Sequence, residues 1–317
     1  MRKILTLAAV AGLASGATAC GAGAEGGAEP GAPNVVVTTN ILGDVVSSAF
    51  GDLVEVEVIM PAGADPHEFA ASAKQATAME DADLLVLNGA GFEAGLQGVI
   101  DSVTNGGTTV FAFADHMELL SGNSHDQDEE HADEELGPND PHLWTDPVRV
   151  AAALTVLGEQ VGALAGVDAE TAGERAAAYV GALDDLDAEI VDLLAPVPAE
   201  GRIIVTNHEV FGYFADRYEF TLAGAVVPSL TTKSESSAQE LEALVEVLRA
   251  QTVRVIFAET TQSTQLAEAL AAQVGSEVEI VELFTESLGE AGSGADTYLG
   301  MMRTNAQLIA DSLVGSE

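Results

Sequence analysis

The sequence predicts an α/β fold made of two similar lobes, each with a four-stranded parallel sheet, joined by a single long helix. Short aliphatic runs alternate with stretches of helical composition in two separate sets of four, which is the pattern of parallel sheets covered by helices. A stretch with apolar residues at helical spacing separates the two sets. The chain has 317 residues, of which 47% are hydrophobic, so it is long and apolar enough for two packed domains.

The first 33 residues are expected to lie outside the folded body. A basic start is followed by an apolar run, Ile4 to Gly16, which is shorter than the roughly 20 residues of a membrane span and has the layout of a signal peptide. The segment resembles a bacterial lipoprotein signal, with residues 1–19 removed and Cys20, the single cysteine, lipidated. Ala17 stands where that pattern usually has Leu, so a plain signal peptide is the alternative. Residues 20–33, rich in Gly, Ala and Pro, are predicted to be a flexible tether.

The N-terminal lobe is predicted to span residues 34–167. Its strands are expected at four short runs of aliphatic residues: Val35–Thr38, Val54–Ile59, Leu84–Leu87 and Thr109–Phe113. Helical composition is found between strands at Leu42–Phe50 and Ser72–Asp81. The alternation of strands and helices predicts a parallel sheet.

The linking helix is predicted within residues 168–196. Asp168 is a suitable N-cap and Pro196 ends the helical pattern. Apolar residues recur at helical spacing: Ala176, Tyr179, Leu183, Leu186, Ile190 and Leu193. A continuous helix from Asp168 to Leu194 would be about 40 Å long. Two shorter helices with a break near Gly181 are the alternative.

The C-terminal lobe is predicted to span residues 197–317 and to repeat the first in type. Its four expected strands are Ile203–Thr206, Thr221–Val226, Val253–Ala258 and Val278–Val281. Helices are predicted at Ala238–Ala250 and Thr264–Val274.

The charge of the chain argues against several classes of partner. There are 51 Asp and Glu residues against 11 Lys and Arg, a formal net charge of −40. Such a surface repels nucleic-acid phosphate and anionic lipid headgroups and attracts cations. We therefore expect no nucleic-acid partner.

Three histidines and one glutamate follow predicted strand ends, where sheets of this kind open their ligand-binding crevice. They are His67, His142, His208 and Glu286, two from each lobe. Each one alone is more often a surface or capping residue than a ligand. Together, three neutral imidazoles and one carboxylate form a complete first coordination shell for Zn²⁺. The sequence therefore predicts a metal site in the cleft between the lobes, and such a shell suits holding a metal rather than reacting with it.

Five motifs give the chain a family resemblance. They are PHEF at His67, DPHLWTDP at His142, NHEVFGYFA at His208, NGAGFE from Asn88 to Glu93 and YLGMMRTN from Tyr298 to Asn305. By these motifs the chain resembles the metal-specific solute-binding proteins of bacterial ABC transporters, of the zinc-uptake receptor type.

The resemblance covers nearly all of the mature chain and implies His67, His142 and His208 as imidazole ligands. The fourth ligand of that family is often Asp, whereas Glu286 stands here. It also implies two four-stranded lobes joined by one long helix, limited hinge closure, delivery to a membrane permease and no catalysis. We expect a monomer on the outer face of the cytoplasmic membrane, held by a lipid anchor.

The donor types favour Zn²⁺ as the cargo, because nitrogen-rich sites prefer late transition metals. Mn²⁺ or iron is the alternative within the same family. The manganese receptors of that family commonly carry a carboxylate in place of the third histidine, whereas this chain keeps His208. Glu209, next to His208, is a less favoured ligand in its place. An acidic loop with His116, His125 and His131 is either an accessory metal-collecting segment or simply a solvated acidic loop.

A secreted zinc hydrolase is the competing hypothesis from another class. It would need an open coordination position and a general base, for which Glu68, Glu209 or Glu259 could serve. His67-Glu68 and His208-Glu209 begin like the metalloprotease motif HExxH, but neither has the second histidine. We therefore predict no enzyme activity. Trp144 is predicted to pack beneath the metal site.

Overall fold

The structure is a computed structural model that describes residues 31–122, 139–275 and 278–314. The predicted signal peptide, Cys20 and the loop histidines His125 and His131 lie outside these ranges. Among the helices within them, none has the length and apolar character needed to cross a bilayer.

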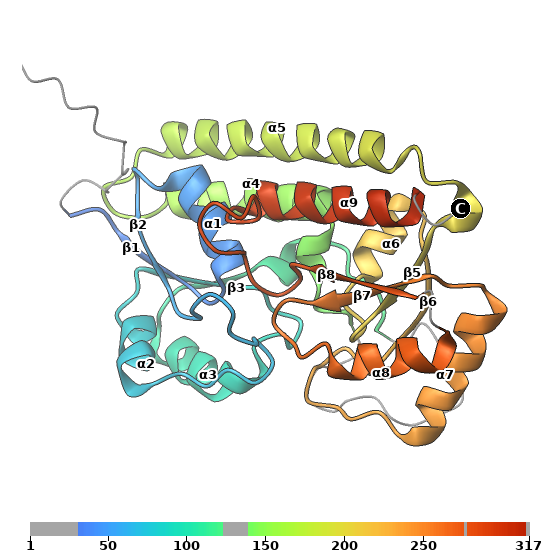
Figure 1. Cartoon of the computed structure of the whole chain (residues 1–317). Helices are drawn as coiled ribbons and strands as arrows, with labels where there is room; N and C mark the ends of the chain where they lie inside the picture. Colours follow the sequence, from blue (N-terminus) through green and yellow to red (C-terminus); the bar gives the residue numbers. More distant parts are fainter. Residues whose placement is uncertain (1–30, 123–138, 276–277, 315–317) are drawn as a thin grey trace, which may run out of the picture.

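The first sheet contains four parallel strands in the order β2-β1-β3-β4 (Figure 1). The strands are β1 (Asn34–Val37), β2 (Glu55–Val58), β3 (Leu84–Leu87) and β4 (Val110–Ala112). The central strands β1 and β3 are almost wholly aliphatic and buried, whereas β2 alternates Glu and Val at an exposed edge. Continuous apolar runs are what a strand covered on both faces requires.

Within the described residues, four helices cover this sheet, and three of them begin at a side chain that caps their first turn. They are α1 (Asn40–Phe50), α2 (Ala73–Glu80), α3 (Gln97–Gly106) and α4 (Pro147–Gly162). Thr39 caps α1, and Ser72 forms a capping box with Gln75 at α2. Asp146 caps α4, and Pro147 occupies its first position. The sequence analysis predicted the first two helices but not α3 or α4.

The second sheet repeats the first, with four parallel strands in the order β6-β5-β7-β8. Its strands are β5 (Ile203–Thr206), β6 (Thr221–Ala225), β7 (Val255–Glu259) and β8 (Glu279–Leu283). The helices of this half are α6 (Gly212–Tyr218), α7 (Ala238–Ala250), α8 (Gln265–Val274) and α9 (Tyr298–Val314). The two identical strand orders confirm the predicted pair of four-stranded parallel sheets.

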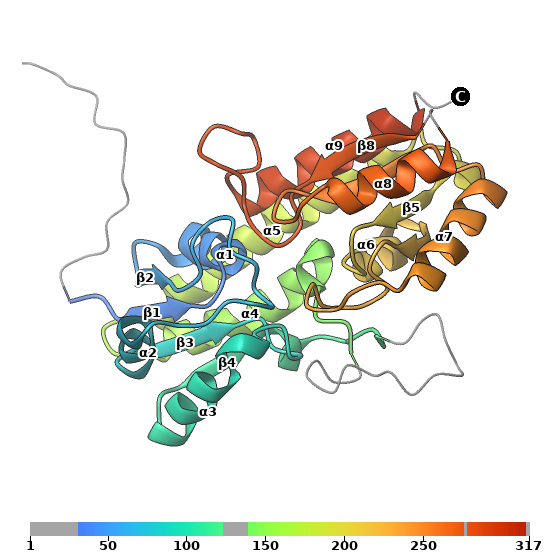
Figure 2. The same cartoon turned by 60° about the horizontal axis from the view of Figure 1, so that its bottom comes forward.

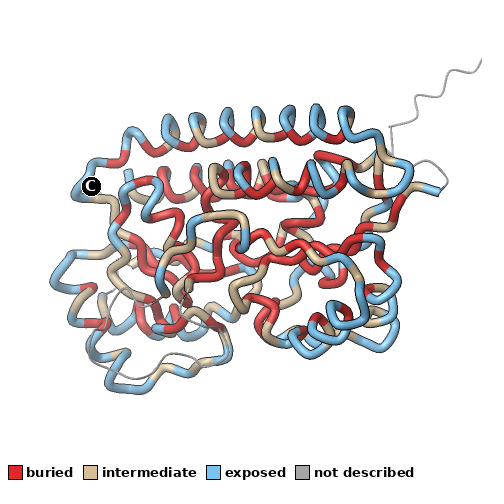
Figure 3. Tube along the Cα trace, turned by 180° about the vertical axis from the view of Figure 1, so that it is seen from behind, coloured by how far each residue is buried: buried red, intermediate tan, exposed pale blue. Residues whose placement is uncertain are grey.

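The long helix α5 (Ala169–Leu194) is continuous through Gly181, so the alternative of two shorter helices is wrong. Asp168 caps it by accepting a hydrogen bond from the backbone N–H of Thr171. The helix runs along one side of both lobes and packs on α4 and α9 (Figure 1). Its inward stripe, which includes Leu183 and Ile190, is buried, while its outward face is exposed (Figure 3).

One hydrophobic core runs through both lobes. It joins Val35 and Leu84 of the first sheet, Leu183 of α5, Ile204 of the second sheet and Tyr298 of α9. Two smaller cores lie farther out, one under α2 and α3 and the other under α7 and α8. Figure 2 shows where these four helices lie. The lobes are therefore packed together on the side of α4, α5 and α9, and the strand ends that carry the candidate ligands face one another across the cleft.

Candidate metal centre

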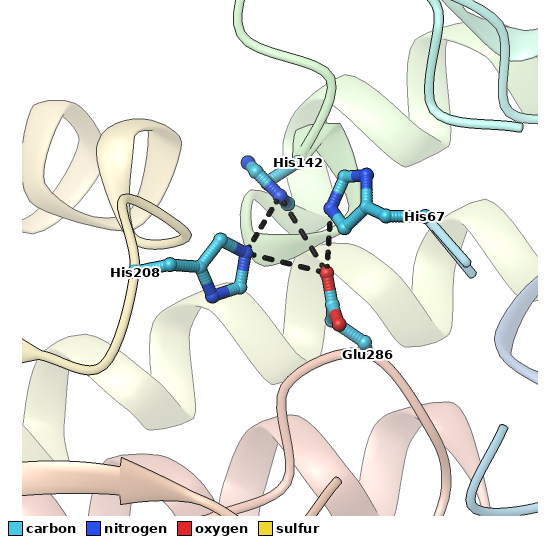
Figure 4. Close-up of side chains that lie close together, drawn as sticks. All are labelled: His67, His142, His208 and Glu286. Carbon is cyan, nitrogen blue, oxygen red and sulfur yellow. Dashed lines mark hydrogen bonds and ion pairs between the residues drawn. The ribbon is translucent and has the colours of Figure 1, made fainter. Parts of the chain in front are cut away.

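The structure brings together the four side chains that the sequence singled out. His67 lies in the loop after β2, His142 follows the first sheet, His208 follows β5 and Glu286 follows β8. The four side chains point toward one another between the lobes (Figure 4). One donor atom from each lies within 4.8 Å of the others, and all four residues are at most 1% exposed. Each lobe contributes two of them.

The distances within this cluster suit one small cation. Nε2 of His67 and Nε2 of His208 lie 2.9 and 3.3 Å from Oε1 of Glu286. Nε2 of His142 lies 3.7 Å from the same oxygen and 3.2 Å from Nε2 of His208. Tetrahedral Zn²⁺ with bonds of 2.0–2.1 Å places its donors about 3.3 Å apart. These four separations therefore lie near those of a four-coordinate zinc shell.

Unsatisfied polar atoms also point to a cation at this place. Nδ1 and Nε2 of His67 and both carboxylate oxygens of Glu286 are buried without a well-formed hydrogen bond to the described residues. Buried polar groups without partners cost free energy. A bound cation would satisfy Nε2 of His67 and the Glu286 carboxylate at once.

Two of the imidazoles are held by carboxylates on their far side. Nδ1 of His142 lies 2.8 Å from Oδ1 of Asp140, and Nδ1 of His208 lies 2.6 Å from Oε1 of Glu259. A carboxylate that accepts a hydrogen bond from Nδ1–H keeps the proton on that nitrogen and leaves the lone pair of Nε2 directed at the cluster. Thr285 donates its hydroxyl proton to the other oxygen of Glu259 and so ties the carboxylate to the Glu286 loop.

His67 is oriented by packing. The ring of Phe92 meets the His67 imidazole edge to face, with centroids 5.1 Å apart. The short 3-10 turn after Phe92 approaches the His67 loop so closely that a Cβ on Gly95 would lie 2.2 Å from the carbonyl oxygen of Phe69. Glycine at position 95 therefore permits the contact that holds this loop.

The turn from Asn88 to Glu93 supports two ligand loops at once. The buried carboxylate of Glu93 accepts hydrogen bonds from the backbone N–H groups of Asn88 and Gly89 and from the hydroxyl of Thr38. The side-chain amide of Asn88 donates to the carbonyl of Pro141, next to His142. Burial raises the pKa of Glu93 despite these hydrogen bonds. The turn thus positions Phe92 on one side and the His142 loop on the other.

Trp144 lies beneath the cluster, as predicted. Its indole packs 4.6 Å from Phe92 and 5.5 Å from His142, measured between ring centroids. Its Nε1 donates to the carbonyl of Thr285, and its own carbonyl accepts from the hydroxyl of Tyr298. This tryptophan therefore ties the floor of the site to the shared core.

The protonation of the cluster depends on its charged neighbours. Burial lowers the pKa of His67. Burial also disfavours a charged His208, but Glu259 and Glu286 outweigh it and hold the pKa of His208 well above its ordinary value. Burial would raise the pKa of Glu286, yet the imidazoles around it hold that pKa well below its ordinary value. For His142, Asp140 overcomes burial and raises the pKa.

The remaining predicted residues do not join the cluster. His116 stacks on Phe111, with ring centroids 4.4 Å apart, and is half-buried. Glu68 is exposed, and the backbone N–H of Glu209 donates to Ser229. Glu259, considered as a general base, is instead the partner of His208. His125, His131 and Cys20 lie outside the described residues.

The sequence analysis missed Asp140 as a partner of His142 and the role of Phe92. Asp140 had a usable signal, because the tripeptide Asp-Pro-His occurs twice, at Asp65 and at Asp140. In both copies the Asp accepts the backbone N–H of the His two residues later, at 2.9 Å. Phe92 gave no comparable signal, since its contact with His67 depends on the tertiary fold.

Comparisons with known proteins agree with this architecture. The family described as the periplasmic component A of the zinc-uptake complex matches residues 35–312. The zinc-binding protein TroA of Treponema pallidum is 29% identical over 92% of both chains. The manganese-binding lipoprotein MntA of Halalkalibacterium halodurans is 28% identical over 99% of both. A solved structure of the Treponema protein superposes with a TM-score of 0.77 and covers 89% of this chain and 99% of its own.

The family match covers almost all the described residues, and the solved relative has the same two-lobed fold. The chain therefore belongs to the family of periplasmic zinc-uptake complex components.

Proposed function

We propose that the protein captures Zn²⁺ between its two lobes outside the cytoplasmic membrane and delivers it to the permease of an ABC importer. The observation that carries this proposal is the convergence of three Nε2 atoms and one carboxylate oxygen on a single buried point. His67, His142, His208 and Glu286 are the proposed ligands. The metal is cargo, and four protein donors hold it without leaving a position for a reacting water.

The proposed location is the outer face of the membrane. The first 19 residues have the layout of an export signal and precede Cys20. Relatives that match 99% of this chain are named as metal-binding lipoproteins. We propose a lipid anchor on Cys20, a flexible tether before Asn34 and a monomeric body that contacts the permease.

A manganese receptor is the second candidate, because relatives named for manganese match as fully as those named for zinc. The donor set argues for zinc, since three imidazole nitrogens and one carboxylate suit a borderline metal better than the oxygen-preferring Mn²⁺. Loading at equal free concentrations of Zn²⁺ and Mn²⁺ separates the two. A site filled with manganese under these conditions would reject the zinc assignment.

A zinc hydrolase is not supported. The family is one of uptake components. Of the residues considered as general base, Glu259 is hydrogen-bonded to His208 and Thr285, and Glu68 is exposed outside the cluster.

Equilibrium dialysis against a series of chelators tests the proposal. We expect one tightly bound Zn²⁺ per chain in the wild type and none in the triple variant His67→Ala, His142→Ala, His208→Ala. His116→Ala is the matched control, because this histidine stacks on Phe111 outside the cluster. Tight zinc binding that survives in the triple variant would overturn the assignment of these ligands.

A further inference from the structure

The two Asp-Pro-His tripeptides use their aspartates differently. Asp140 contacts the imidazole of the histidine in its own tripeptide, with Oδ1 2.8 Å from Nδ1 of His142. Asp65 accepts the backbone N–H of His67 through Oδ1, while Nδ1 of His67 has no hydrogen-bond partner among the described residues. The second carboxylate oxygen of Asp65 is therefore available for a different contact.

That oxygen reaches the other lobe. Oδ2 of Asp65 accepts a hydrogen bond from the hydroxyl of Thr232 at 2.6 Å and from the side-chain amide of Gln262 at 2.7 Å. Thr232 lies in the loop after β6, and Gln262 lies in the turn between β7 and α8. One carboxylate thus connects the His67 loop to two loops of the C-terminal lobe. We call Asp65, Thr232 and Gln262 the Asp65 latch.

The same loop is fastened at a second point. The backbone N–H of Gly63 donates to Oγ of Ser287 at 2.8 Å, and Ser287 follows Glu286 directly. The side-chain amide of Asn40 donates to the same hydroxyl at 2.8 Å. The loop from Pro61 to Phe69 therefore contacts the C-terminal lobe at two positions before His67, at Gly63 and at Asp65.

The latch lies on the side of the cluster that can open. On the opposite side, Trp144, Tyr298 and Leu183 belong to a core that continues through both lobes. On the latch side, Thr232 and Gln262 line a cavity of about 130 Å³ that reaches His208 and Glu259. All four proposed ligands are at most 1% exposed, so an ion bound among them can leave only when loops separate. The contacts of Asp65 with Thr232 and Gln262 are among those that must break for the His67 loop to separate from the C-terminal lobe.

We propose that the Asp65 latch sets the rate at which the bound cation leaves the site. The inference rests on the proposed function, since it concerns release from the same cluster. Hydrogen bonds to a carboxylate are stronger than those between neutral groups. They hold the loops together only in the closed form, so their loss speeds dissociation. Association begins from the separated form, in which the bonds are broken, so its rate changes little.

Stopped-flow kinetics on the full-length protein tests the latch. The variant Thr232→Val with Gln262→Met removes both donors with little change in side-chain size and leaves Asp65 bonded to the backbone of His67. We expect Zn²⁺ release into excess chelator to become about tenfold faster, from two hydrogen bonds at a half-buried place, with an unchanged association rate. The single substitutions are measured beside it, and each should speed release about threefold.

The control variant is Gln97→Met with Thr104→Val. It removes a hydrogen bond from Gln97 to the Asp101 carboxylate and one from the Thr104 hydroxyl to the backbone carbonyl of Ile100, both within α3, and should release zinc at the wild-type rate. Variants that bind one Zn²⁺ but release it no faster than the control would overturn the latch while leaving the proposed function intact. If the substitutions lowered the association rate and the release rate by the same factor, the effect would be a general structural one, and this result would also overturn the latch. A wild type that takes up no zinc would refute the proposed function and the latch together.

Discussion

Oε1 of Glu259 lies 2.6 Å from Nδ1 of His208, and both residues are buried. The carboxylate also lies 3.2 Å from the backbone N–H of His208 and accepts the hydroxyl proton of Thr285. These contacts fix the ring so that Nε2 faces Glu286. Glu259 therefore sets the tautomer of His208 and raises the basicity of its Nε2, as carboxylates commonly do for histidines that bind metals.

Replacing Glu259 by Gln tests this role. The amide keeps the size of the side chain and can still accept from Nδ1, but it removes the charge that makes His208 a better donor. We expect zinc affinity to fall about 10- to 100-fold, the usual effect of losing such a partner, in competition with a chelator of known affinity. Glu282→Gln, on an exposed position of β8, is the control. Equal affinities of the two variants would show that Glu259 does not tune the site.

Glu286 offers a second test through two different changes. Glu286→Gln removes the negative charge that faces three imidazoles, and we expect it to weaken zinc binding at least about 100-fold. Glu286→Asp keeps the charge but withdraws it by one bond of about 1.5 Å. We expect this variant to bind one Zn²⁺ more weakly than the wild type and more tightly than Glu286→Gln, as measured by isothermal titration calorimetry. Tighter zinc binding by Glu286→Gln than by Glu286→Asp would indicate that the length of the side chain matters more than its charge.

Zinc affinity should fall as the pH falls, starting above pH 6.5. Without metal, Glu259 and Glu286 outweigh burial and hold the pKa of His208 well above its ordinary value of 6.5, so its ring binds a second proton more readily than an ordinary imidazole does. That proton must leave before Nε2 can coordinate. Affinity is therefore constant above the raised pKa and declines below it. Glu286, whose pKa is held well below its ordinary value, stays ionised in this range.

Calorimetry in buffers of different ionisation enthalpy measures the released proton directly. We expect proton release on zinc binding at pH 7, and less of it at a pH above the raised pKa of His208. In Glu259→Gln the decline in affinity should move to lower pH, because a main cause of the raised pKa is gone. An affinity that stays flat from about pH 8 to about pH 5.5 would contradict a site with three histidines.

Much of the fold could be predicted because several strands are short aliphatic runs with polar residues at both ends. The runs at Leu84–Leu87 and Ile203–Thr206 are buried aliphatic strands bounded by polar residues, and the structure reproduces both. The helices α4 (Pro147–Gly162) and α9 (Tyr298–Val314) were not predicted from the sequence. Both helices contribute buried residues to the shared core, among them Leu154 of α4 and Ile309 of α9.

The candidate ligands could be found because each follows a strand of a parallel sheet, where topology brings loops together. The partners that orient them could not be found in the same way. Glu259 is the last residue of β7 and meets His208 only because β5 and β7 are neighbours. Asp65 and Thr232 are joined across the lobes at 2.6 Å, a contact that depends on how far the cleft is closed and not on any local pattern.

The shared core makes a last prediction about stability. Leu183 is fully buried on the inward face of α5, among residues from both lobes. Leu183→Ala should lower the free energy of unfolding by about 2–5 kcal/mol through lost burial and a residual cavity. Denaturant unfolding of the metal-free protein measures this, with Asp184→Ala on the exposed face as the control. Because the core joins the two sheets, the loss should shift a single transition for the whole body. Two separate transitions, with only one of them moved, would show that the lobes unfold independently and that α5 is a connector rather than part of a common core.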